Sequence, residues 1–277
     1  MKTKPKEIIA IVFVLVVLTI IGLVVGSYVG YGNSIAIAVD LGFVIFVAVE
    51  LVRRLKIHLT KEIRDGVAQN EAYMALLDTV KPRIPLPPTR GWAASPDFLR
   101  LVAQHIIELK PHQMVELGAG VSSIISGYIL EKQGSGKLTS FEHDTDYANK
   151  YRQILDLHGL SAYIDIYDKP FKQYDINGKQ WTWYDFPEMG QIDLLIIDGP
   201  PKHIQHLARY PALPLLKKHL KPGSVILADD TNRKDLQEIV KLWKQEFDNW
   251  SFENLPAEKG AYKIVVIPNH TNAASQG

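Results

Sequence analysis

The first 52 residues are far more apolar than the rest of the chain. Residues 8–29 are almost wholly apolar, and residues 34–52 form a second apolar run that two acidic residues interrupt. A helix needs about 20 apolar residues to cross the hydrocarbon core of a bilayer, so each run is just long enough. The uncharged segment Gly30-Tyr31-Gly32-Asn33 between them suits a tight turn. We therefore predict a two-helix transmembrane hairpin over residues 1–52.

Basic residues flank this hairpin at both ends, whereas its turn carries no charge. Positively charged flanks stay in the cytoplasm, so we expect both ends of the hairpin, and the domain that follows, on the cytoplasmic side. A cleaved signal peptide is the alternative interpretation of the first run, and it leaves the domain on the same side. Asp40, an acid at membrane depth, needs a partner on the other helix or on another subunit, which leaves a homo-oligomer open. The flanking residues are Lys2, Lys4, Lys6, Arg53, Arg54, Lys56, Lys61 and Arg64.

A connecting segment is predicted between the hairpin and the rest of the chain, over residues 53–89. Apolar residues recur at near-helical spacing over residues 53–80, which predicts an amphipathic helix that acts as a spacer. Four prolines then fall within the seven residues 82–88, and such a run favours an extended chain. Ser95 and Pro96 are the predicted N-cap and first residue of the next helix. We expect a domain over residues 90–268 and a disordered tail over 269–277.

Within this domain, short apolar stretches of strand character alternate with longer helix-like stretches. The alternation predicts a Rossmann-like α/β fold with a doubly wound, mostly parallel sheet of seven strands. The last two strands follow each other directly, so the final strand is expected to be antiparallel. Asn177-Gly178, between polar-aromatic arms, predicts a β-hairpin within residues 171–184. The predicted strands are 114–117, 137–142, 162–167, 192–197, 224–228, 250–253 and 262–267, and the predicted helices are 121–133, 145–158, 203–219 and 232–247.

Composition narrows the chemistry that the domain can perform. Charge is balanced, with 31 Lys and Arg against 30 Asp and Glu, so nothing favours a nucleic acid partner. The chain has no cysteine, which excludes disulfide bonds, thiolate metal ligands and a cysteine nucleophile. Candidate chemistry therefore has to come from glycine turns, carboxylates and histidines.

Two turns at predicted strand ends have the residue types of a nucleotide site. Gly118 and Gly120 follow the first strand, where glycines let a ligand approach the backbone and the first amides of the next helix. Ser123 stands in place of the third glycine of the dinucleotide fingerprint, which disfavours a nicotinamide cofactor without eliminating it. Glu142 ends the second strand, where one carboxylate can accept hydrogen bonds from both hydroxyls of a ribose. Asp144 is expected to cap the helix that follows.

Three acids follow the fourth and fifth strands, namely Asp198, Asp229 and Asp230. Ligands bind at the carboxyl ends of strands in open α/β sheets, and these acids should converge there. Carboxylates packed together repel, so they need a cation, a shared proton or well-placed donors. Ligation by oxygen alone would suit Mg²⁺ or Ca²⁺. The alternative is that Asp198 and Asp230 cap turns and face Arg233 or Lys202, and both interpretations stay open.

Four stretches within residues 90–267 together resemble the class I S-adenosylmethionine-dependent methyltransferases, particularly methyltransferase family 24. The resemblance implies that S-adenosylmethionine binds with Glu116, Gly118 and Gly120 along its methionine and ribose side. It also implies that Glu142 holds the ribose hydroxyls. In the same way, His143 and Asp144 would lie by the adenine, and Asp198 would lie beside the cofactor. The four stretches are VELGAG at 115–120, FEHD at 141–144, IDLLIIDG at 192–199 and LKPGSVILADD at 220–230.

A narrower similarity concerns the turn Ala228-Asp229-Asp230, which, with Asp198, resembles the magnesium site of catechol-type O-methyltransferases. It implies that Asp198, Asp229 and Asp230 bind Mg²⁺, although Pro200-Pro201 replaces the polar loop of that group. An oxygen acceptor must lose a proton, and Lys202, His203 and His206, just past Asp198, are candidates for this role. Asp198 and His203 are the predicted catalytic residues.

The sequence thus predicts a membrane-anchored methyltransferase that O-methylates a small or membrane-associated acceptor, such as a lipid-linked molecule. One alternative is a non-catalytic membrane scaffold that keeps the fold, which the glycine turn and the acid cluster disfavour. The other is a nicotinamide-dependent oxidoreductase, which Ser123 disfavours.

Overall fold

The computed structural model describes residues 16–17, 19–25, 27–28 and 32–268, and the chain divides into two compact units, Met1–Gly66 and Val67–Gly277. Helix α2, Gly32–Val80, passes without a break through the predicted boundary at residues 52 and 53. Much of the predicted first span and the whole predicted tail, 269–277, lie outside the described residues. Among the residues that are described, no helix has a stretch long and apolar enough to cross a membrane. The transmembrane hairpin stays a prediction from the sequence.

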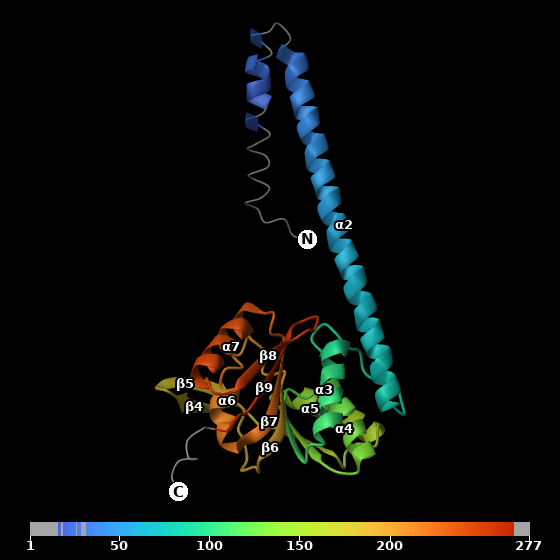
Figure 1. The fold of residues 1–277 in the computed structure, drawn as a ribbon, viewed down its shortest axis with the longest axis vertical. Helices are drawn as coiled ribbons and strands as arrows, with labels where there is room; N and C mark the ends of the chain where they lie inside the picture. Colours follow the sequence, from blue (N-terminus) through green and yellow to red (C-terminus); the bar gives the residue numbers. More distant parts are fainter. Residues whose placement is uncertain (1–15, 18, 26, 29–31, 269–277) are drawn as a thin grey trace, which may run out of the picture. The chain divides into compact units, whose positions relative to one another are not determined.

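A seven-stranded sheet forms the centre of the second unit (Figure 1). Its strand order is β3-β2-β1-β6-β7-β9-β8, with the first five strands parallel and β9 antiparallel to both of its neighbours. The predicted doubly wound sheet with an antiparallel last strand is therefore confirmed. The strands are β1 Gln113–Leu117, β2 Lys137–Glu142, β3 Ile164–Asp168, β6 Ile192–Ile197, β7 Leu220–Asp229, β8 Ser251–Leu255 and β9 Ala261–Val265.

Helices cover both faces of this sheet, with α3, α4 and α5 on one side and α6 and α7 on the other (Figure 1). The double covering explains why β6 is a continuous apolar run, since neither of its faces meets water. The predicted hairpin is also present, as the two-stranded sheet β4–β5 that packs on the α6 and α7 side. The elements are α3 Pro96–Leu109, α4 Val121–Gln133, α5 Thr145–Leu157, β4 Lys172–Ile176, β5 Lys179–Trp183, α6 Ala212–Leu216 and α7 Lys234–Glu246.

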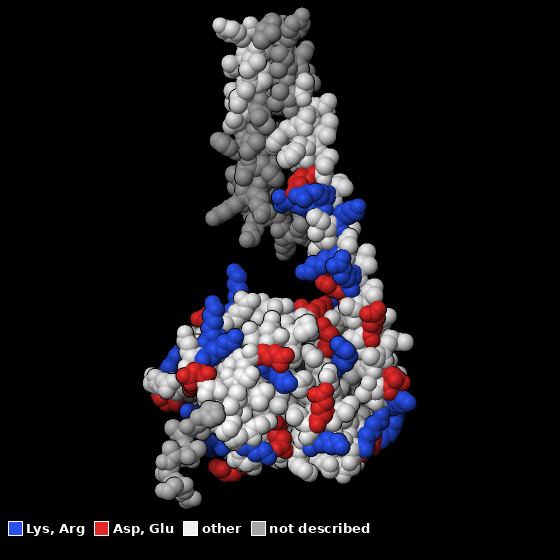
Figure 2. Space-filling model, viewed as in Figure 1, with Lys and Arg blue, Asp and Glu red and all other residues white. Residues whose placement is uncertain are grey.

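The last turns of α2 belong to the core of the second unit. Leu76 and Val80 are fully buried in the same apolar cluster as Phe98 and Leu99 of α3. The core thus begins upstream of residue 90, where the sequence suggested the start of the domain. On the face shown in Figure 2, basic and acidic side chains are interspersed over this unit, in keeping with the balanced charge of the chain.

Over residues 203–219 the sequence predicts a helix that Pro211 and Pro214 kink or split, and the structure is helical only from Ala212 onward. Turns occupy residues 202–211, and only α6 and a short 3-10 helix, Lys217–His219, are helical. Pro211 is the reason, because its ring clashes with the preceding turn and it has no N–H to donate, so a helix can begin at this proline but cannot pass through it. Residues 202–211 are thereby free to form an irregular loop at the carboxyl edge of the sheet.

Candidate active site

Strand register brings the predicted site residues to one edge of the sheet. Leu117, the last residue of β1, pairs with Phe141 of β2 and with Ile197 of β6. Ile197 in turn pairs with Ala228 of β7. The next residue of each strand is therefore level with the others, and these four residues are Gly118, Glu142, Asp198 and Asp229.

A cavity of about 380 Å³ opens at this edge. Its wall includes most of the predicted residues, whereas Glu116, Gly120 and Asp229 are not part of it. The structure thus gathers residues from the ends of four strands around one space. The predicted residues on the wall are Gly118, Glu142, His143, Asp144, Asp198, His203 and Asp230, and the others are Trp92, Ala119, Tyr147, Tyr184, Gly199, Pro201, Arg209 and Arg233.

Gly118 holds the turn after β1 against the turn after β6. Its φ of +96° is rarely adopted by other residues, and a Cβ added here would lie 3.1 Å from the backbone nitrogen of Gly199. Gly120 differs, because its backbone is extended and an added Cβ would meet only Ser122 Oγ, at 3.7 Å. Of the two predicted glycines, only Gly118 is required by the backbone.

Glu142 presents one free carboxylate oxygen at the cavity. Its Oε1 accepts hydrogen bonds from the backbone N–H groups of His143 and Asp144, at 2.7 and 3.0 Å. Its Oε2 accepts none from the described residues, although the side chain is largely buried. The buried atoms without a partner in the described part of the chain do not include this oxygen, so it is accessible from the cavity and can accept hydrogen bonds from a ligand that brings hydroxyl donors.

The two residues after Glu142 have separate roles. His143 stacks on Phe171, with ring centroids 5.0 Å apart and an interplanar angle of 12°. Asp144 caps α5, because its Oδ1 accepts a hydrogen bond from the backbone N–H of Tyr147 at 2.9 Å. The predicted capping role of Asp144 is confirmed.

Glu116 lies beneath the cavity wall. It is fully buried in β1, where its Oε2 accepts hydrogen bonds from the hydroxyls of Ser123 and Ser140. Its Oε1 has no hydrogen-bond partner among the described residues. Burial raises the pKa of Glu116 to about 7, although the serine hydroxyls lower it. In this structure the side chain supports the glycine turn from below.

The three predicted acids converge, and a buried arginine lies among them. One oxygen each of Asp198, Asp229 and Asp230 falls within 4.8 Å of the others. The Arg209 side chain, 4% exposed, donates through Nη2 to Asp198 Oδ1 at 3.3 Å and to Asp230 Oδ2 at 3.1 Å. Arg233 also pairs with Asp230 Oδ2, at 2.8 Å, as one alternative drawn from the sequence expected, whereas Asp198 pairs with Arg209.

Sequence reasoning missed Arg209, although a signal existed. The residue stands between Leu207-Ala208 and Tyr210-Pro211, an apolar setting that is unusual for an exposed arginine.

Burial raises the pKa of Asp198 while Arg209 opposes this rise. Burial and the nearby carboxylates raise the pKa of Asp229 well above its ordinary value, and its Oδ2 has no partner in the described part of the chain.

Tyr184 is a second residue that the sequence did not single out. It follows β5, its ring is buried against Phe171, and it lies on the cavity wall. A Cβ added to Gly199 would lie 2.5 Å from its hydroxyl, which places that hydroxyl at the glycine turns. The hydroxyl has no hydrogen-bond partner among the described residues, so it is another polar atom that a ligand could satisfy.

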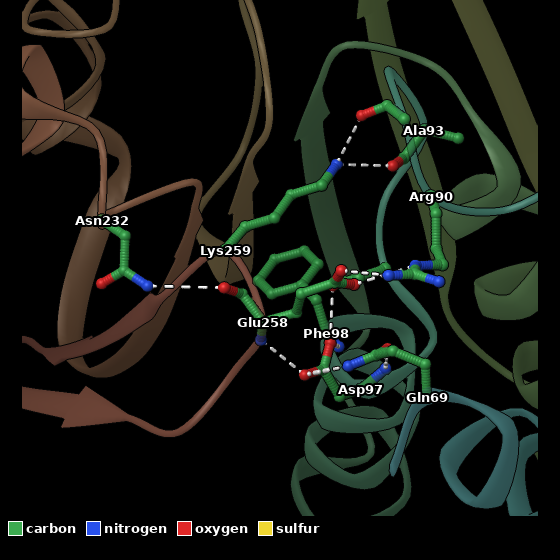
Figure 3. A network of polar contacts seen from close by, with 10 residues as sticks. Gln69, Arg90, Ala93, Asp97, Phe98, Asn232, Glu258 and Lys259 are labelled. Atoms are coloured by element: carbon green, nitrogen blue, oxygen red, sulfur yellow. Dashed lines mark hydrogen bonds and ion pairs between the residues drawn. The ribbon is translucent and has the colours of Figure 1, made fainter. Parts of the chain in front are cut away.

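The mouth of the cavity carries Trp92, which is 83% exposed. Lys259 Nζ donates to the backbone oxygens on either side of Trp92, those of Gly91 at 2.9 Å and Ala93 at 2.8 Å. Figure 3 shows these bonds beside the ion pair of Arg90 with Glu258. The turn between β8 and β9 thus clamps the backbone around Trp92.

The remaining predicted residue, His203, is exposed on the loop that follows β6 and faces the cavity. Lys202 and His206, its neighbours on this loop, do not belong to the wall. Of the basic and imidazole groups on the loop before Leu207, His203 is therefore the one placed to meet a bound ligand.

Known proteins share this fold and part of the sequence. Residues 115–231 match methyltransferase family 24, whose model is described as a methyltransferase domain. The SAH-bound methyltransferase PaMTH1 of Podospora anserina is 12% identical, with a TM-score of 0.53 over 74% of this chain and 95% of that one. An O-methyltransferase from Bacillus cereus in complex with SAH is 13% identical, with a TM-score of 0.50 over 74% and 97%. No curated protein matches in sequence.

At such low identity the two structures speak for the fold alone, while the family match rests on the sequence of the site itself. It spans β1 to the end of β7, which contains the glycine turn, Glu142 and the three acids. The match and the strand order agree with the resemblance drawn from four short stretches. They identify residues 115–231 as a class I S-adenosylmethionine-dependent methyltransferase domain of family 24.

Proposed function

We propose that the cavity binds S-adenosylmethionine and that the protein transfers its methyl group to an oxygen atom of an acceptor. The observation that carries the proposal is the Oε2 of Glu142, which accepts no hydrogen bond from the described residues and is accessible from the cavity that Gly118 also lines. A ribose diol supplies two hydroxyl donors to such an oxygen. SAH, the demethylated product, is present in both structures reported above, which supports the same cofactor here.

Several residues of the chain fit the other parts of this cofactor. Gly118 keeps the backbone after β1 open to close approach, because no side chain projects there. The stacked rings of His143 and Phe171 lie next to Glu142 and offer a flat surface for the adenine. Asp198 follows β6, on the other side of β1 from Glu142, where its carboxylate can meet a positively charged group of the ligand.

When bound, the cofactor supplies a methyl group on a positively charged sulfur. The protein's contribution is to orient the acceptor oxygen toward that carbon, since proximity and alignment account for much of the rate of such a displacement. The acceptor oxygen must also lose a proton. We propose that His203, which is exposed on the cavity wall, takes that proton, and that Asp198 on the same wall is the second catalytic residue.

Calorimetry with the purified full-length chain tests the cofactor. We expect saturable binding of SAH with a 1:1 stoichiometry, and no binding of NAD at the same concentrations. Binding of NAD without SAH would refute the proposal and favour an oxidoreductase. SAH binding without methyl transfer to any oxygen acceptor would favour the scaffold, and transfer of tritium from labelled S-adenosylmethionine to acceptor pools distinguishes these outcomes.

We further propose, from the sequence of residues 8–52, that the chain is anchored in a membrane and methylates a membrane-associated or lipid-linked acceptor. Two apolar runs with basic flanks support this proposal. The test is extraction of membranes with alkaline carbonate, which should leave the full-length chain in the pellet. Recovery in the supernatant, or methyl transfer to freely dissolved acceptors alone, would contradict it.

A further inference from the structure

The sequence left open whether a metal ion or donor groups neutralise the three acids at the carboxyl edge of the sheet. We propose that the Arg209 guanidinium takes the place of a divalent cation between Asp198 and Asp230, and that cofactor binding and methyl transfer are independent of metal. The second half of this statement rests on the function proposed above. The first half concerns the acid cluster alone and stands without it.

The contacts of Arg209 resemble those of a bound cation in one respect: several oxygen atoms from two strand ends surround one positive group. Nη1 donates to the backbone oxygen of Asp229 at 3.1 Å, and Nε lies 3.4 Å from that of Pro200. Nη2 donates to the backbone oxygen of Asp198 and, more weakly, to carboxylates of Asp198 and Asp230. Arg209 thus links the end of β6 to the end of β7.

These contacts already engage one carboxylate oxygen of each predicted metal ligand, whereas Asp229 Oδ2 has no partner in the described part of the chain. A metal ion of this class requires carboxylate oxygens that are free to coordinate it. Asp198 Oδ1 and Asp230 Oδ2 already accept hydrogen bonds from Arg209, and Asp229 Oδ1 accepts one from the backbone N–H of Asp230 at 2.7 Å. A cation held by all three acids would lie close to a guanidinium that is itself almost fully buried.

Charge leads to the same conclusion. Arg209 and Arg233 bring two positive charges to a cluster of three acids, and Arg233 pairs with Asp230 at 2.8 Å. Adding a divalent ion would make the cluster net positive and would place it beside two guanidinium groups. The repulsion would be strongest with Arg209, whose side chain is only 4% exposed.

Arg209 acts in this proposal as a positioning residue. It holds both the backbone oxygen and the carboxylate of Asp198, so it fixes the side chain that faces the cavity beside Gly199. A metal ion would do the same for an acceptor by direct coordination. With a guanidinium in that place, the acceptor oxygen has to be oriented by the other groups of the wall.

The experiment titrates MnCl₂ into the full-length chain and measures SAH binding in the presence of EDTA or MgCl₂. We expect no saturable Mn²⁺ binding in the wild type up to about 1 mM, the weak end of protein cation sites. The dissociation constant of SAH and the methyl transfer rate should agree within about twofold between EDTA and MgCl₂, less than the tenfold change that 1.4 kcal/mol would produce.

Arg209→Ser tests this role by a gain of Mn²⁺ binding, which the loss of a merely structural contact would not produce. Removing the guanidinium frees the carboxylates, so this variant should gain saturable Mn²⁺ binding, and Asp230→Asn in the same chain should abolish the gain. Arg233→Ser is the matched control, because it removes one arginine from Asp230 but leaves Arg209 in place, and it should gain none.

Saturable Mn²⁺ binding by the wild type, or a tenfold loss of methyl transfer in EDTA, would overturn the proposal. A folded Arg209→Ser variant that gains no Mn²⁺ binding would also contradict it. If that variant fails to fold, the wild-type titration and Arg209→Lys still test the proposal. Arg209→Lys keeps the positive charge and should bind no Mn²⁺. Failure of SAH to bind would refute the proposed function, while the Mn²⁺ titrations would still test the role of Arg209.

Discussion

Replacing Glu142 with glutamine tests the ribose contact with little change in shape. In the wild type, Oε1 is held by the backbone N–H groups of His143 and Asp144, while Oε2 is left for the ligand. Glutamine can keep its oxygen toward these two N–H groups, and this turns its NH₂ group toward the cavity. That group can donate but cannot accept, so the hydroxyl donors of the ribose lose their partner.

The magnitude follows from the kind of bond that is lost. A hydrogen bond to a charged group contributes about 1.5–3 kcal/mol, so the dissociation constant of SAH should rise about 10- to 150-fold in Glu142→Gln. Calorimetry measures this change, and the melting temperature should stay close to the wild-type value. Glu253→Gln, an exposed acid on β8, is the control and should bind SAH as the wild type does. SAH binding by Glu142→Gln within about threefold of the wild type would refute the assignment of Oε2 to the ribose.

Three further perturbations follow from the geometry of the site. Gly118→Ala should lose about 1–3 kcal/mol of unfolding free energy and bind SAH weakly, because φ is +96° and the new Cβ lies 3.1 Å from a backbone nitrogen. Urea denaturation and calorimetry measure these two effects. Gly190→Ala, with no atom near its Cβ, is the control and should change neither. The folded-state pKa of Glu116, about 7, lies above its unfolded value of 4.5. The free energy of unfolding should therefore fall as pH rises from about 4.5 through 7, by about 3 kcal/mol at most. Urea denaturation of Glu116→Gln at several pH values should show this loss removed. Lys259→Met should free the backbone around Trp92, and faster tryptic cleavage there, with SAH affinity unchanged, is the expected result; equal cleavage rates would show that the clamp is unnecessary.

The parallel sheet could be predicted from the sequence because its signals are local. β2, β6 and α4 have the bounds that the apolar pattern indicated, and Asn177-Gly178 sits at the turn of the β4–β5 hairpin. Glu142 and Asp198 were found for the same reason, since each directly follows a strand. Level register among parallel strands then determines that these residues meet.

The residues that escaped prediction are placed by contacts between distant segments. Arg209 lies on an irregular loop, and its partners come from the ends of β6 and β7. Tyr184 enters the cavity wall from the end of an inserted hairpin. Neither position follows from periodicity, because both depend on where a loop crosses the edge of the sheet. Because the sequence pattern predicted a helix from residue 203 onward, it did not predict the loop over residues 202–211 that carries Arg209.

The burial of the last turns of α2 changes how a shortened version of this protein should be made. A version that begins at the proline-rich segment would omit Leu76 and Val80, which are fully buried, and would remove Gln69, which bonds Asp97 at the start of α3. Losing the burial of two such apolar side chains costs about 3–6 kcal/mol, a large part of the 5–15 kcal/mol that stabilises a typical domain. Expression trials should therefore start at or before Val67, so that the excised piece carries its own final helical turns.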